Sequence, residues 1–223
     1  MAYDKPYQLL IFDWDGTLAN SAAQIVSAMQ QAIVDLELPP RPDHAISELI
    51  GLGFDEGLAL LYPGADIPAL MRRIYHYRAQ AMTEGPTEAP LFNGALETLE
   101  ALAREAYWLT VATGKSRPSL QRSFAQHPGV RDLMLASRTA DETASKPNPL
   151  MLRELLDELQ VPVERALMIG DTEFDVHMAR AIGMDAVGVT CGVHAPARLT
   201  AAGARALLPD VSALAAWLRD QGS

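Results

Sequence analysis

The chain of 223 residues lacks several features that would place it in particular classes of protein. It has a single cysteine, Cys191, which excludes an internal disulfide and is typical of proteins from reducing compartments. No apolar run approaches the roughly 20 residues that a membrane-spanning helix needs, so we expect no membrane association. The N-terminus has no basic segment followed by a long apolar stretch, which predicts no signal peptide and a cytoplasmic location.

Positive charge is also scarce. Lysine and arginine together number 18 against 28 acidic residues, and lysine occurs only at positions 5, 115 and 146. A formal net charge of −10 provides no basic field for a phosphate backbone, so we expect no nucleic-acid partner. An anionic small molecule would have to be captured locally, by a metal ion or a few cationic groups. The remaining composition, 49% hydrophobic and 21% charged, is that of an ordinary globular protein. It does not indicate whether the protein is a monomer or an oligomer.

Apolar runs of strand length alternate with helical patterns through most of the chain. We expect strands at 9–12, 107–112, 133–135, 166–169, 186–189 and 206–208. Such alternation predicts an α/β fold with a parallel sheet and right-handed crossovers. Residues 17–90 carry helical patterns only, at 21–38, 46–50, 54–62 and 66–82. We therefore expect a separate helical unit inserted directly after the first strand.

Polar side chains follow several of these strands. Asp13 and Asp15 come directly after the first strand, where two carboxylates repel each other and resist desolvation. The other polar residues at or near strand ends are Thr113, Lys146, Asp171 and Asp175. Because the carboxyl ends of parallel strands meet at one edge of a sheet, we expect all six to converge there. Phosphoryl transfer needs such a set: a nucleophile, a divalent cation and fixed donors for the phosphate oxygens.

Four motifs, taken in order, resemble those of the haloacid dehalogenase (HAD) superfamily. They are Asp-x-Asp-Gly-Thr-Leu at 13–18, Thr113 at a strand end, Lys146 before a proline, and Gly-Asp-x-x-x-Asp at 170–175. The chain is most similar to the phosphoglycolate-phosphatase-like branch, which has a helical cap. The resemblance implies a Rossmann-like parallel sheet core, residues 1–17 and 91–223, with an inserted all-helical cap domain, residues 18–90. Hinges are then expected at 18–20 and 84–90.

The resemblance also implies catalytic roles. Asp13 would attack phosphorus and form an aspartyl-phosphate intermediate. Asp15 would protonate the leaving oxygen and later accept a proton from the hydrolytic water. Mg²⁺ would be held by the Asp13 carboxylate, the Asp15 backbone carbonyl and Asp171.

The same resemblance implies how the phosphoryl group is held. Thr113, the Gly114 N–H and Lys146 would bind it, and Asp175 would orient Lys146 or a metal-bound water. Gly114 departs from the family pattern, because many relatives carry asparagine there. Glycine keeps the backbone donor and loses a side-chain contact, so we expect an altered substrate preference.

The expected activity is that of a HAD-like phosphoric monoester hydrolase acting on a small, phosphoglycolate-like metabolite. Asp15 argues against a dehalogenase, and the absence of lysine from residues 17–90 argues against a phosphonoacetaldehyde hydrolase. A β-phosphoglucomutase-like sugar-phosphate mutase stays open, since it shares both aspartates and the cap. It would need cationic cap groups, and the candidates are Arg41, Arg72, Arg73 and Arg78. A non-catalytic phosphate- or metal-binding regulator is less favoured, because no motif residue is missing.

Overall fold

The core of the molecule is a six-stranded parallel sheet, seen in a computed structural model that describes residues 5–84 and 89–221. The strands are β1 (Leu9–Phe12), β2 (Trp108–Thr113), β3 (Met134–Thr139), β4 (Ala166–Gly170), β5 (Asp185–Val189) and β6 (Ala206–Leu208). They lie in the order β3-β2-β1-β4-β5-β6, and each neighbouring pair is parallel. The expected α/β fold is therefore confirmed.

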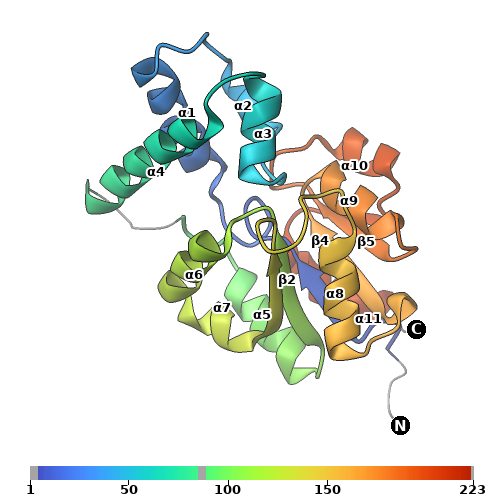
Figure 1. Ribbon diagram of the computed structural model, residues 1–223. Coiled ribbons are helices and arrows are strands. Elements are labelled where there is room, and N and C mark those ends of the chain that lie inside the picture. The colour runs from blue at the N-terminus through green and yellow to red at the C-terminus, as the bar shows by residue number, and fades with distance from the viewer. Residues whose placement is uncertain (1–4, 85–88, 222–223) are drawn as a thin grey trace.

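Helices cover both faces of this sheet (Figure 1). Leu10 and Phe12 point from β1 into a cluster with side chains of α5 (Ala95–Arg104), α7 (Pro128–Leu133) and α11 (Leu214–Gln221). Leu9 and Ile11 point to the opposite face, which is covered by α8 (Leu150–Leu159), α9 (Glu173–Arg180) and α10 (Pro196–Ala202). The other core helices are α6 (Arg117–Gln126), η1 (Val163–Arg165) and η2 (Val211–Ala213). Burial on both faces explains the continuous apolar run of β1.

Two core elements differ from the sequence-based expectation. Strand β3 extends four residues beyond the predicted 133–135, because its later residues are only partly buried and show no apolar run. Helix α7 was not predicted, since its six residues are too few for a helical period to stand out.

A helical segment follows β1 and lies beyond the carboxyl ends of the strands (Figure 1). It comprises α1 (Ala22–Asp35), α2 (Asp43–Ser47), α3 (Phe54–Leu61) and α4 (Ile67–Glu84), and the described part of 17–90 contributes no strand to the sheet. The four helices enclose a hydrophobic cluster of their own, which includes Ile25, Ile46 and Ile74. An independent cluster is what a separate folding unit requires.

The two connections between this segment and the core lie side by side. The Asn20 N–H donates to the Pro90 carbonyl at 2.9 Å, and the Phe92 N–H donates to the Leu18 carbonyl at 2.9 Å. Residues 85–88 of the expected second hinge lie outside the described residues. The first expected hinge, residues 18–20, is therefore hydrogen-bonded to residues 90–92, where the chain returns from the helical segment to the core.

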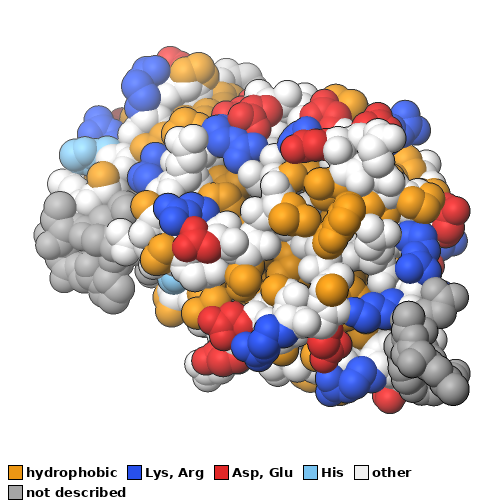
Figure 2. All heavy atoms as spheres, turned by 90° about the horizontal axis from the view of Figure 1, so that it is seen from below, with side chains coloured by type: hydrophobic (Ala, Val, Ile, Leu, Met, Phe, Trp, Pro, Cys, Tyr) orange, Lys and Arg blue, Asp and Glu red, His pale blue; other side chains and the backbone are white. Residues whose placement is uncertain are grey.

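The described surface carries charges of both signs. Figure 2 shows one face on which basic and acidic side chains are interspersed among hydrophobic ones. Within the described residues, no helix combines the length and apolar character that crossing a bilayer requires.

Candidate active site

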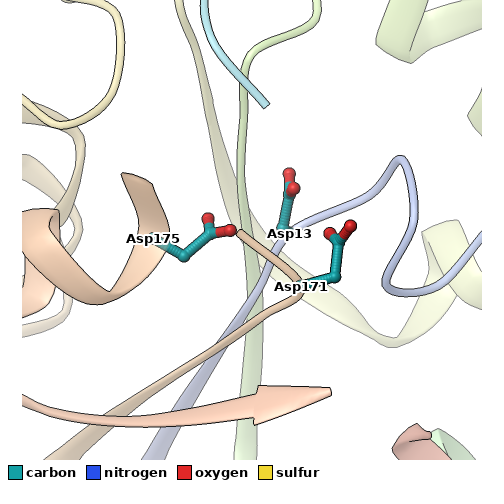
Figure 3. A group of neighbouring side chains, drawn as sticks. All are labelled: Asp13, Asp171 and Asp175. Carbon is teal, nitrogen blue, oxygen red and sulfur yellow. The ribbon is translucent and has the colours of Figure 1, made fainter. Parts of the chain in front are cut away.

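The three central strands bring the sequence-predicted residues together. Strands β2, β1 and β4 are adjacent, and their carboxyl ends carry Thr113, Asp13 and Asp171 respectively. Lys146 comes from the loop before α8, and Asp175 from the first turn of α9. All five side chains are buried. Figure 3 shows the Asp13 and Asp171 carboxylates beyond the end of the sheet, with Asp175 directed toward them from α9.

The two motif aspartates lie on either side of a buried tryptophan. Trp14 packs edge-on against Phe124, with centroids 5.4 Å apart, within the core cluster on one face of the sheet. The Asp13 and Asp15 side chains, by contrast, both line a common pocket.

Lys146 lies between two buried carboxylates. Its Nζ is 2.7 Å from Asp13 Oδ1 and 2.7 Å from Asp175 Oδ1, as close ion pairs whose angles fall outside hydrogen-bond geometry. Burial alone would lower the pKa of the Lys146 ammonium, but the two carboxylates outweigh it and raise this pKa above its ordinary value. Lys146 therefore remains charged and compensates part of the negative charge at the site.

Asp171 is held by the loops around it. It accepts hydrogen bonds from the Thr17 hydroxyl at 3.0 Å and from the Val193 N–H at 2.9 Å. Gly16 has a φ of +83°, and a Cβ there or at Gly192 would collide with the Asp171 carboxylate. These glycines give the carboxylate room beside the backbone.

Negative charge is not fully compensated by Lys146. Burial, with repulsion from neighbouring carboxylates, raises the pKa of Asp13 to about 7, although Lys146 counteracts the shift. Burial and the charges of Asp13 and Asp175 raise the pKa of Asp171 well above its usual range. A further cation would favour the ionised form of both groups.

The carboxylates fit a divalent metal ion. Oxygens of Asp13, Asp171 and Asp175 lie within 4.8 Å of one another, and Asp13 Oδ2 is buried without a hydrogen-bond donor among the described residues. Both oxygens of Asp175 already have partners, Lys146 on Oδ1 and the Thr172 N–H and hydroxyl on Oδ2. Each Asp171 oxygen accepts a single hydrogen bond from a neutral donor, whereas Asp175 contacts the Lys146 cation and two further donors, so Asp13 and Asp171 are the better ligands. Hard carboxylate oxygens suit Mg²⁺.

Asp15 has two partners to which the sequence analysis gave no role. Lys115 Nζ lies 2.9 Å and 3.0 Å from its two carboxylate oxygens, and the Ser21 hydroxyl donates to Oδ1 at 2.7 Å. Lys115 is only 6% exposed, and its N–H donates to Thr113 Oγ1 at 3.2 Å. The scarcity of lysine was the signal that could have identified Lys115.

A pocket lies between these residues and the helical segment. Its space is about 640 Å³, and part of this space is open to solvent. It is lined by Asp13, Asp15, Ile25, Met29, Ile46, Leu49, Ile50, Gly51, Leu52, Phe54, Gly57, Leu58, Tyr75, Thr113, Gly114, Lys115, Ser116 and Ser119.

The loop at 50–54 brings the helical segment into contact with the core. The Gly53 N–H donates to the Ser145 hydroxyl at 2.6 Å, next to Lys146. A Cβ at Gly114 would collide with the Leu52 carbonyl oxygen. Gly114 therefore permits a backbone approach that asparagine would block, which is a different reason for this residue from the one expected.

Known proteins resemble this chain over nearly its whole length. The sequence pattern of the family described as haloacid dehalogenase-like hydrolase matches residues 10–189. The phosphoglycolate phosphatase of Rhodospirillum rubrum is 30% identical over 218 residues, 94% of this chain and 90% of that protein. The phosphoglycolate phosphatase of Agrobacterium fabrum is 33% identical over 193 residues, 82% of this chain and 81% of that protein.

A solved structure gives the same result for the fold. The crystal structure of a hydrolase from Pseudomonas syringae superposes with a TM-score of 0.83 at 24% identity, covering 97% of this chain and all of that one. The chain belongs to the haloacid dehalogenase-like hydrolases. The expected enzyme class, a HAD-like phosphatase, is thereby confirmed.

Replacing Lys146 with methionine should destabilise the metal-free protein. The change keeps the side chain's length but leaves the buried Asp13 and Asp175 without their shared cation. We expect the free energy of unfolding to fall by about 3–5 kcal/mol, measured by urea denaturation in EDTA. Adding Asp175→Asn should recover part of the loss. If Lys146→Met alone were as stable as the wild type, Lys146 would not be compensating the buried charges of Asp13 and Asp175.

Mg²⁺ should raise the melting temperature more at about pH 7.5 than at about pH 5.5. With a folded-state pKa of about 7, Asp13 binds a proton in the folded protein at pH values where the unfolded chain has lost it. Its contribution to the stability of the metal-free protein therefore falls as pH rises toward 7, and metal must displace that proton at low pH. Scanning fluorimetry measures both shifts. Asp171→Asn should abolish them, and an unchanged response in that variant would exclude this metal site.

Replacing Gly114 with alanine should lower kcat/KM at least about tenfold with little change in melting temperature, because a displaced helical segment cannot complete the pocket. Gly129→Ala is the matched control, since a Cβ there meets only the flexible Leu96 side chain at 3.3 Å. Kinetics with an aryl phosphate compare the two. Wild-type kinetics for Gly114→Ala would show that close contact with Leu52 is dispensable.

Proposed function

We propose that this chain is a Mg²⁺-dependent phosphatase that hydrolyses a small phosphorylated metabolite through an aspartyl-phosphate on Asp13. The observation that carries the proposal is Asp13 Oδ2, a buried carboxylate oxygen to which no described residue donates, at the edge of a pocket and beside the Lys146 ion pair. A carboxylate so placed is able to act as a nucleophile toward a phosphoryl group bound between it and Lys146.

The proposed reaction has two steps. A carboxylate oxygen of Asp13 forms a bond to phosphorus, the ester P–O bond breaks, and Asp15 gives its proton to the leaving oxygen. Water then attacks the phosphorus of the acyl phosphate, Asp15 takes a proton from this water, and inorganic phosphate leaves as Asp13 is restored. Lys115 and Ser21 hold the ionised Asp15 carboxylate in position to take the proton from this water.

The remaining polar groups hold the phosphoryl oxygens. Lys146 supplies positive charge next to Asp13, and its contact with Asp175 fixes the direction of the ammonium. Thr113 and the Gly114 N–H come from the end of β2 and the loop after it, on the same side of the pocket. Mg²⁺, held by Asp13, Asp171 and the Asp15 carbonyl, would neutralise phosphate charge when bound.

The helical segment, assigned as residues 18–90, serves in this proposal as a cap domain. Its contacts through Gly53 and Gly114 cover the catalytic aspartates and exclude water while the intermediate forms. Substrate enters when the cap moves away on its two adjacent connections. A pocket that a closing cap covers leaves little room for a macromolecule, which favours a small molecule as substrate. Because relatives are named phosphoglycolate phosphatases, phosphoglycolate is the first metabolite to test.

Hydrolysis is favoured over phosphoryl return to a sugar. A mutase must retain a bisphosphate, for which cationic cap groups are required. Arg41 instead donates to the Leu61 carbonyl at 3.1 Å, Arg73 pairs with Asp35 at 2.6 Å, and Arg72 is exposed. The side chain of Arg78 lies outside the described residues.

Asp13→Asn should abolish turnover because it removes the nucleophile without changing the shape of the side chain. We expect phosphate release from an aryl phosphate in Mg²⁺ to fall at least about a thousandfold. Asp15→Asn, the matched control, should slow turnover while leaving the first step detectable. Acid quenching and mass spectrometry of the peptide that carries Asp13 should show phosphate on the wild type. Full activity of Asp13→Asn would disprove the covalent mechanism.

A further inference from the structure

The cap side of the pocket is apolar. The helical segment contributes Ile46, Leu49, Leu52, Phe54 and Tyr75 to the lining, and none of its described lining residues is charged. The rings of Phe54 and Tyr75 lie next to each other, with centroids 6.1 Å apart and planes tilted by 49°. Among these five side chains the Tyr75 hydroxyl is the one hydrogen-bond donor, and the others stabilise an apolar or aromatic group by burial.

The core side of the pocket does not offer a free cation for a second anionic group. Among the side chains that the structure describes, Lys115 is the only cationic residue that lines the pocket. Its ammonium already contacts both oxygens of Asp15, at 2.9 Å and 3.0 Å. A carboxylate on the substrate would therefore meet neutral hydroxyl groups, such as those of Tyr75, Ser116 and Ser119, and no free cation among the described lining residues unless Lys115 left Asp15.

We propose that the ester group of the natural substrate is uncharged and largely apolar, an aryl or alkyl group, and that the enzyme discriminates against esters bearing a carboxylate. This inference rests on the proposed phosphatase function. It places the phosphoryl group at Asp13 and Lys146 and the ester group against Leu49, Phe54 and Tyr75. Phosphoglycolate, which the names of the relatives suggest as substrate, does not belong to this class, because the ester group of phosphoglycolate carries a carboxylate.

A pair of substrates that differ by one carboxylate tests the proposal on the wild-type enzyme. Phenyl phosphate and 4-carboxyphenyl phosphate share the reacting bond and the ring, and phosphoglycolate is included as a third substrate. We expect kcat/KM in Mg²⁺ to be at least about tenfold higher for phenyl phosphate than for either carboxylated ester, because an unpaired buried anion is costly.

Two variants identify the wall responsible. Leu49→Arg places a cation in the pocket wall, and we expect it to shift the ratio of kcat/KM at least about tenfold toward 4-carboxyphenyl phosphate. Leu60→Arg is the matched control, since Leu60 lies in α3 and is 65% exposed outside the pocket lining. It should leave the ratio unchanged.

The outcomes separate this inference from the function on which it rests. Preference for phenyl phosphate in the wild type supports both. Equal or greater activity on the carboxylated esters, lost with Asp13→Asn, overturns the substrate class and leaves the phosphatase standing. Absence of phosphate release from every ester, with Mg²⁺ present, overturns the function and the inference together. The comparison of esters with the wild-type enzyme tests the substrate class even if Leu49→Arg does not fold.

Discussion

The ion pairs of Lys146 with Asp13 and Asp175 are the interaction on which the rest of this site depends. Several carboxylates are buried within a few ångströms of one another, and such groups do not stay ionised without positive charge nearby. Lys146 supplies one charge, and the donor-free oxygen of Asp13 leaves a place for more. A divalent cation and the phosphorus atom of the substrate are the partners that we propose for it. Charge compensation thus connects the stability of the fold to phosphoryl chemistry.

The parallel sheet makes this arrangement possible. Because β1, β2 and β4 are neighbours and run in one direction, residues far apart in the chain end at the same edge. The backbone dipoles and loops there are covered by a helical segment with its own hydrophobic cluster. Contact between the two parts depends on backbone approach at Gly114 and a hydrogen bond to Ser145, the residue before Lys146. The helical segment is therefore linked to Lys146 through the neighbouring residue Ser145.

The sequence was sufficient to predict the residues at strand ends. Asp13, Thr113 and Asp171 follow apolar runs, so strand direction alone brings them together. Lys115 and Ser21 were not assigned, because their contacts with Asp15 depend on loop conformations that have no periodic signal. The later half of β3 was missed for a similar reason, since its partly buried residues lack an apolar run.

The sequence also leaves the apolar wall of the pocket undecided. Leu49 and Phe54 are as compatible with an ordinary helix core as with a substrate contact, and only the packing of the cap on the core shows which residues line the pocket. The same packing explains why residue 114 is a glycine, because a Cβ there would collide with the Leu52 carbonyl oxygen. Residues whose positions follow from the period of a strand or helix were thus predictable. Residues whose contacts depend on how the helical segment packs on the core were not.

We propose that the edge of the sheet holds one divalent cation between Asp13 and Asp171, beside the Lys146 ion pairs. Anomalous diffraction from crystals grown with Mn²⁺ locates such an ion. We expect a single strong peak about 2.1 Å from a carboxylate oxygen of each aspartate, with Lys146 still next to Asp13 and Asp175. A peak elsewhere, or an Asp13 carboxylate that contacts no metal, would contradict it.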